Sequence, residues 1–293
     1  GNEKLDQIWI EYNDFLLAEA TAVNTETISN TKNKNLSSQQ IRTSMWQSLL
    51  TSQPHTQNVD EFIVNVAQTK WFEQLQSDLT SESTTDLTND LGRFKYLTSS
   101  RQPGYKLDLK DNDLMEHFPK TISKSTYNHI KRTFSKLEEL NGKNSVTFDI
   151  VTAPKQIDVL LTNFCTWHIN KWKNTNTPSG FLNEHFANFH KLVCINAECD
   201  NEATTPIAFS ISVDSNVNGF IYGFTATSSF HFYLSSIAPN SDNNIKAGLL
   251  LQSMAIEACR NMSVNYYDFL AGEASYKSKL SNIHTLFANL TIQ

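Results

Sequence analysis

The chain has 293 residues, enough for one large domain or two ordinary ones with a sizeable core. Its eighteen Phe and nine Tyr exclude a largely disordered chain, because disordered segments lack the aromatic side chains that fill a core. The net charge of −6 disfavours a nucleic-acid partner, which would require a basic surface. Lys131 and Arg132 are instead expected on the solvated side of a helix.

The cysteines point to a reducing compartment. Cys165, Cys194, Cys199 and Cys259 form no CxxC pair and no His/Cys spacing typical of zinc, so no metal is expected. Cys165 and Cys259 lie in apolar helical stretches, where cysteine acts as a small hydrophobe. No stretch of about 18 apolar residues occurs, and no signal peptide is evident. A cytoplasmic protein without a membrane span is therefore expected, with Gly1 interpreted as a tag remnant or a trimmed start.

Residues 1–120 carry scattered signals of secondary structure. The expected elements are a strand entering a helix over 1–20, a loop over 21–40, a helix over 41–50, a strand over 61–66, a loop over 80–89, and short strands at 95–97 and 105–109 around a turn at 102–104.

A regular alternation of elements follows residue 120. A helix is expected over 123–141, ended by Asn141-Gly142. Its predicted buried stripe is Tyr127, Ile130, Phe134, Leu137 and Leu140. The elements expected next are a strand at 146–151, a helix over 154–173 opened by Pro154, a helix over 182–191, strands at 192–197, 206–213, 219–225 and 231–237, a helix over 246–260, a strand at 264–270, a short helix near 275 and a strand at 285–291.

This order predicts an α/β or α+β fold, a central mixed sheet flanked by helices. The helix over 246–260 joins two strands as a crossover. The strands at 231–237 and 264–270 should therefore be parallel neighbours.

The start of that crossover helix is a candidate anion site. Small residues at Ala247 and Gly248 let a ligand approach the backbone, where free N–H groups and the helix dipole favour negative charge. Lys246 adds a positive charge. The alternative is an ordinary strand–helix connection with small residues for packing.

A second candidate lies in the segment 265–280. The strand ends near Asp268, a turn at Gly272 follows, and Glu273, Tyr276 and Lys277 come next. Binding and catalytic groups often lie at strand ends in such folds. The alternative is structural: Asp268 caps the turn, Tyr276 fills the core, and Lys277 pairs with Glu273 four residues away on one helical face.

These residues resemble a known motif. The run Tyr267-Asp268-Phe269-Leu270-Ala271-Gly272-Glu273 with Tyr276-Lys277 resembles the Phe/Tyr-Asp-Phe-Leu-x-Gly-(Asp/Glu)-x-x-Tyr-Lys pattern of the cellulose-biosynthesis-associated (CelD-like) branch of GNAT acetyltransferases, which is related to FemAB-type transferases. Further matches over about 120–285 are Trp167-His168-x-x-Lys171-Trp172, Phe186-x-x-Phe189-His190, Pro206-Ile207-Ala208 and Ala247-Gly248-Leu249-Leu250-Leu251. Lys246-Ala247 replaces the Pro usual in the family at the pyrophosphate turn.

The resemblance implies a GNAT fold over 121–293, with 1–120 as part of an incomplete first GNAT-like half. It implies transfer of an acetyl or other acyl group from acyl-CoA to an amine by direct attack on the thioester. The implied catalytic residues are Asp268, Glu273 and Tyr276, with Tyr276 as donor to the thiolate. The implied cofactor-binding residues are Lys246, Ala247, Gly248 and Leu249. The implied acceptor-binding residues are Trp167, His168, Trp172, His190 and Lys277.

Several alternatives stay open from the sequence. His168 and His190 are further candidate bases, or helix-face histidines with structural hydrogen bonds, while Trp167 and Trp172 could be core residues. The acceptor could be a small molecule or a polysaccharide or peptide amine. Other functions are a FemAB-like aminoacyl transferase and a non-catalytic GNAT-fold protein that binds acyl-CoA or acts as a scaffold. The oligomeric state is open.

Overall fold

The structure, a computed structural model, describes residues 62–68, 96–110, 123–175, 178–197, 204–226, 228–239 and 245–292. The chain divides into two compact units, residues 1–9 with 103–285 and residues 10–102 with 286–293. In the second unit, β1 (Phe62–Gln68) pairs antiparallel with the C-terminal part of β8 (Ile283–Ile292). This confirms the strands expected at 61–66 and 285–291. The elements expected before residue 61, the loop at 80–89 and Cys199 lie outside the described residues.

The first unit contains the alternating elements. In chain order they are α5 (Lys124–Asn141), β3 (Val146–Val151), α6 (Pro154–Trp172), α7 (Glu184–Asn196), β4 (Thr204–Val213), β5 (Asn216–Ala226), β6 (Ser229–Ile237), α8 (Ala247–Asn261), β7 (Tyr266–Ala271) and α9 (Ser275–Leu280). With β2 (Tyr96–Asp108), the described strands here lie in the order β2-β7-β6-β5-β4-β3. The β6–β7 pair is parallel, and the other neighbouring pairs of these described strands are antiparallel. The expected mixed sheet is confirmed.

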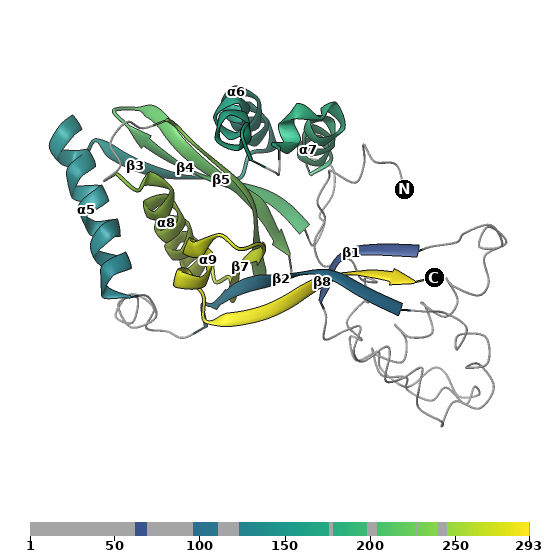
Figure 1. Cartoon of the computed structure of the whole chain (residues 1–293). Coiled ribbons are helices and arrows are strands. Elements are labelled where there is room, and N and C mark those ends of the chain that lie inside the picture. The colour runs from purple at the N-terminus through teal and green to yellow at the C-terminus, as the bar shows by residue number, and fades with distance from the viewer. Residues whose placement is uncertain are drawn as a thin grey trace, which may run out of the picture. The chain divides into compact units, whose positions relative to one another are not determined.

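Helices cover both faces of this sheet (Figure 1). Helices α5 and α8 lie on one face, and α6 and α7 lie on the other. Successive strand residues point to opposite faces. Phe209 and Ile221 therefore join the core beneath α8, while Ala208, Phe220 and Tyr222 join a second core beneath α6 and α7.

The ends of α5 follow from local hydrogen bonds. The Ser123 hydroxyl accepts from the Thr126 N–H at the N-terminus, and Gly142 ends the helix with φ 101°. Ile130 and Leu137 are buried as predicted. Leu140 is wrong as a core residue, since it is 62% exposed at the last turn.

Two sequence predictions of secondary structure are wrong. The strand expected at 192–197 is the continuation of α7, because His190 and Cys194 keep a helical spacing that directs both into the core. The turn expected at 102–104 lies within the continuous strand β2. There the Pro103 carbonyl accepts a hydrogen bond from Gly272 N–H, and Gly104 pairs with Ala271, so the ladder with β7 holds this segment extended.

Candidate functional site

The parallel strands β6 and β7 separate after a short pairing. Ser229, Phe230 and His231 of β6 lie opposite Tyr266, Tyr267 and Asp268 of β7. Beyond the His231–Asp268 pair, β6 continues to Ile237 and β7 to Ala271, and the described residues form no further β6–β7 pairs. The expected parallel crossover is confirmed.

Bulges in both strands accompany this separation. Tyr233 is the extra residue of β6, because Phe232 and Leu234 lie opposite the consecutive residues Gly223 and Tyr222 of β5. Phe269 is likewise extra in β7 relative to β2. Bulges bend a strand and raise its twist, which gives the divergence a physical cause.

Two backbone features hold these bulges. Leu270 has a φ of 61°, unusual for a branched side chain, and its N–H donates to the Asp268 carboxylate at 2.9 Å. A Cβ on Gly223 would collide with the His231 carbonyl oxygen and lie 2.6 Å from the ring of Phe230. Only glycine allows this approach of β5 to β6.

A row of charged side chains crosses three strands at the divergence. Lys106 of β2 lies opposite Asp268, which lies opposite His231. Asp268 Oδ2 is 3.1 Å from Lys106 Nζ and 3.8 Å from His231 Nδ1, the latter beyond hydrogen-bond length. The Asp268 side chain is 1% exposed, against 23% for Lys106 and 28% for His231. Only the outer members of the row thus reach solvent.

The charges in this row act on His231. Burial lowers the pKa of His231 below its ordinary 6.5, the Asp268 carboxylate raises it, and Lys106 lowers it further. Sequence reasoning missed both Lys106 and His231. Each is a polar residue in an expected strand, but its partner follows only from the order and register of the sheet.

The start of α8 has the features of an anion site. Lys246 is the N-cap residue without a side-chain cap bond, and its own N–H donates to Thr133 Oγ1 of α5 at 3.1 Å. The first N–H groups of a helix, here those of Ala247 and Gly248, have no acceptor within the helix. A Cβ on Gly248 would meet only Ile237 Cγ1 at 3.7 Å, so the backbone there is open. Leu249 is half-buried and packs against the core beneath α8.

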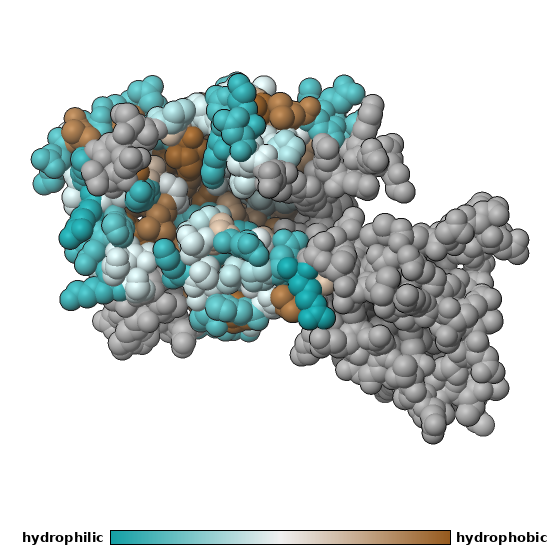
Figure 2. Space-filling view, in the orientation of Figure 1, coloured by the Kyte–Doolittle hydropathy of each residue, from teal (hydrophilic) through white to brown (hydrophobic). Residues whose placement is uncertain are grey.

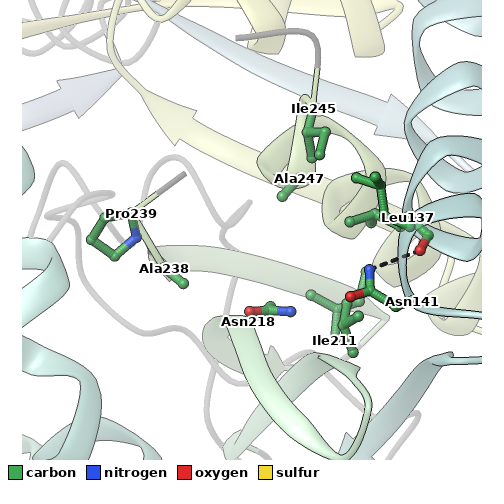
Figure 3. Close-up of a pocket in the computed structure, with 10 residues that line it drawn as sticks. Leu137, Asn141, Ile211, Asn218, Ala238, Pro239, Ile245 and Ala247 are labelled. Carbon is green, nitrogen blue, oxygen red and sulfur yellow. Dashed lines mark hydrogen bonds between the residues drawn. The ribbon is translucent and has the colours of Figure 1, made fainter. Parts of the chain in front are cut away.

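A cavity of about 250 Å³ lies beside this helix start (Figure 3). It is bounded by the C-terminal turn of α5, by β4 and β5, and by the segments on either side of the β6–α8 connection. Its lining residues are Leu137, Leu140, Asn141, Ile211, Val213, Asn218, Ala238, Pro239, Ile245 and Ala247. The walls are mostly apolar, with amides from Asn141 and Asn218. Figure 2 shows hydrophobic residues in brown at several places among the mostly hydrophilic residues of that view.

The predicted residues after Asp268 are dispersed. Tyr276 packs against Phe269, with ring centroids 6.3 Å apart, on the α8 side of β7, whereas Asp268 points to the opposite face with His231. Burial raises the pKa of Tyr276, so its hydroxyl keeps its proton at neutral pH and can donate. The structure therefore does not bring Asp268 and Tyr276 together.

The helical Glu273–Lys277 pair expected from spacing is wrong. Helix α9 begins at Ser275, so Glu273 precedes it and is exposed. Lys277 is buried and its ammonium donates to the Ala271 carbonyl at 2.5 Å. Gly272, with φ 121°, turns the chain so that this ammonium can reach back.

The predicted residues of α6 lie in an aromatic cluster. His168 Nδ1 is 2.8 Å from Ser179 Oγ, and its ring lies 5.5 Å from Phe181 and 5.9 Å from Trp172. Burial lowers the pKa of His168 to about 4, so the imidazole is neutral at pH 7. Trp167 packs on Phe164 with ring centroids 4.4 Å apart.

His190 of α7 extends this cluster to the bulge of β6. Its Nδ1 lies 3.2 Å from the Tyr222 hydroxyl, and its ring packs against Phe186 and Tyr233. Burial lowers its pKa to about 4. The described surroundings offer no hydrogen-bond partner to His190 Nε2 or to Trp172 Nε1.

The cysteines, the possible metal ligands and the helices of the described residues bear on other kinds of site. Cys165, Cys194 and Cys259 are free thiols, and burial raises the pKa of Cys194 to about 11. In the part of the chain that the structure describes, no three His, Cys, Asp or Glu side chains converge in a group that could hold a metal ion. None of the helices there has the length and apolar character needed to cross a membrane.

Comparisons with known proteins give the family. The model of the acetyltransferase (GNAT) domain matches residues 124–278, more than half of the chain. No curated protein sequence matches the chain. A conserved protein of unknown function from Bacteroides thetaiotaomicron shares the fold, with a TM-score of 0.55 at 10% identity over 86% of this chain and 75% of that one.

Two further solved structures are more distant. FemX aligns with a TM-score of 0.40 at 11% identity over 84% of this chain and 76% of its own. A tandem GNAT protein from the clavulanic acid biosynthesis pathway aligns with a TM-score of 0.38 at 10% identity over 72% of this chain and 58% of its own.

Proposed function

The chain belongs to the acetyltransferase (GNAT) domain family, and we propose that it transfers an acetyl or longer acyl group from acyl-CoA to an amine nitrogen. The observation that carries this proposal is the divergence of β6 and β7 after the His231–Asp268 pair, in strands joined in sequence by α8, whose start has no side-chain cap.

Binding of acyl-CoA would use both features. Beyond His231, β7 no longer pairs with β6, so an extended chain bearing amides can lie along this edge as an added strand would. The pantetheine arm of CoA has that chemistry. Its pyrophosphate would bind the N–H groups of Ala247 and Gly248, supported by the charge of Lys246 and the packing of Leu249. The adjacent cavity leaves room for further parts of the ligand.

The chemistry needs a proton acceptor for the amine and a proton donor for the thiolate. The amine nitrogen attacks the thioester carbonyl, and the C–S bond breaks as the N–C bond forms. We assign the donor role to Tyr276. Burial raises the pKa of its hydroxyl, which therefore carries its proton and can donate it. Asp268 is too buried to touch the amine and would act through its neighbours. Glu273 is exposed beside the motif and would contact the acceptor at most from the rim.

The acceptor would lie on the α6 and α7 side. We propose that Trp167, His168, Trp172 and His190 form its wall and that Lys277 fixes the turn after β7 through Ala271. The wall is aromatic, and its two histidines are neutral, so a neutral amine could be held there without repulsion. The acceptor would be a small molecule, or an amine on a sugar, peptide or polysaccharide.

The test begins with the co-substrate. Calorimetric titration with acetyl-CoA and longer acyl-CoAs should show one site on the wild-type chain, and Gly248→Val should weaken it while the protein stays folded. Lys246→Ala should weaken it less than about tenfold, as expected for one exposed charge. Acylation of a panel of amines, followed by mass spectrometry, then tests transfer. Failure of the folded chain to bind any acyl-CoA would refute the proposal, and binding without transfer would favour a non-catalytic acyl-CoA-binding role.

We also propose that residues 1–120 belong to a first GNAT-like half. The support is the length of this region and its expected strands and helices, together with the confirmed strand β1. An experimental structure of the full chain tests this, and a strand–helix order unlike that of 121–293 would refute it.

A further inference from the structure

The row formed by Lys106, Asp268 and His231 lies where the transferred acyl group would be exposed. Direct pairing across β2, β7 and β6 places the three side chains on one face of the sheet. This is the last β6–β7 pair before the strands diverge. A thioester carried along the open edge of β6 would therefore end beside His231.

We propose that His231 is the catalytic base that takes the proton from the attacking amine, with Asp268 and Lys106 as positioning residues that set its basicity. This inference rests on the proposed N-acyltransferase function. The amine proton passes to the imidazole of His231, whose Nδ1 lies 3.8 Å from Asp268 Oδ2. The N–C bond forms, the C–S bond breaks with its electrons on sulfur, the thiolate takes a proton, and His231 returns its proton to solvent.

Accessibility favours His231 over the other candidate bases. Its side chain is 28% exposed, whereas Asp268 in the same row is 1% exposed. His190 is 1% exposed and hydrogen-bonded to Tyr222. His168 of α6 is hydrogen-bonded to Ser179 and lies outside the row at the divergence.

The neighbours of His231 suit a base that gains charge during the reaction. When the imidazole takes a proton, the carboxylate of Asp268 attracts the imidazolium. Lys106, at 3.1 Å from the same carboxylate oxygen, offsets part of that attraction. Burial lowers the pKa of His231, and Lys106 limits the opposing effect of Asp268, so the imidazole is neutral before the amine arrives. On β5, the residue opposite His231 is Phe224, which carries no charge.

The first experiment measures basicity without any substrate. The pKa of His231 is followed by NMR on the full chain, assigned through the loss of its signal in His231→Gln, with exposed His129 as the reference signal. Lys106→Met should raise the pKa of His231 and Asp268→Asn should lower it, each by at least about half a unit. If both variants moved the pKa of His231 in the same direction, or if neither moved it, the proposed coupling of His231 to Asp268 and Lys106 would be refuted. Lys106→Met tests it alone if Asp268→Asn does not fold, because Lys106 is partly exposed.

The second experiment separates binding from transfer. His231→Gln should bind acetyl-CoA with an affinity within about threefold of wild type. Its rate of transfer to an accepted amine should fall by about 10²-fold or more, and the pH profile of kcat/KM should lose its acidic limb. Lys106→Met should move that limb to higher pH. A wild-type chain that acylates an amine, with His231→Gln equally active, overturns this inference alone. A wild-type chain that binds no acyl-CoA, or acylates no amine, overturns it together with the proposed reaction.

Discussion

Replacing Gly223 by alanine tests the cause of the divergence between β6 and β7. The new Cβ would collide with the His231 carbonyl oxygen and lie 2.6 and 2.7 Å from two ring atoms of Phe230. A backbone carbonyl in a ladder cannot rotate away, so β6 itself must move. Overpacking of this kind costs roughly 1–3 kcal/mol. The usual gain of about 0.5–1 kcal/mol for replacing glycine within a strand offsets only part of that cost.

The expected net loss is about 1 kcal/mol, which corresponds to a fall of roughly 2–4 °C in Tm. Gly248→Ala is the matched control. Its Cβ would meet only Ile237 Cγ1 at 3.7 Å, an ordinary contact, and the lost freedom of the unfolded chain should stabilise the protein by about 0.4–1 kcal/mol. Thermal and urea unfolding of both variants measure the difference. If Gly223→Ala were as stable as wild type, close contact with β6 could not be the reason for glycine there.

Three further predictions concern ligand binding, turnover and acid stability. Gly248→Val should weaken acetyl-CoA binding at least about tenfold by calorimetry with an unchanged far-UV spectrum, because its branched side chain covers the open N–H groups; equal affinity would place the anion site elsewhere. Asp268→Asn should lower turnover far more than acyl-CoA affinity, and Tyr276→Phe should lower turnover in a fully folded protein; a silent Tyr276→Phe with an unfolded Asp268→Asn would make this segment structural. Because burial lowers the pKa of His168 and His190 from 6.5 to about 4, the unfolded chain binds protons in this range that the folded chain does not. The free energy of unfolding should therefore fall by up to roughly 1.4 kcal/mol per histidine per pH unit as the pH drops from about 6 to 4, and His190→Phe should reduce that slope in urea titrations.

Periodicity predicted the elements that position the site. The alternation within β6 and the apolar face of α8 are each local patterns, and the strand–helix–strand crossover then favours β6 and β7 as parallel neighbours. The end of α7 was predicted wrongly because Leu192–Ile195 is a short apolar run, which is compatible with either a strand or a helix. Packing of Phe186, His190 and Cys194 against β5 and β6 stabilises the helix instead, and the local sequence does not contain these contacts.

The candidate site itself depends on register, which no local motif contains. The Tyr-Asp-Phe-Leu motif locates Asp268 at a strand end, but the role of that carboxylate follows from Lys106 on one neighbouring strand and His231 on the other. A shift of either pairing by one residue would turn the partner side chain to the opposite face of the sheet. The bulges at Tyr233 and Phe269 begin directly after this row, so the packing that bends the strands apart also fixes which side chains meet at their divergence. On an unbulged pair of strands, β6 and β7 could continue to pair beyond Asp268, and no open edge would then lie beside the row.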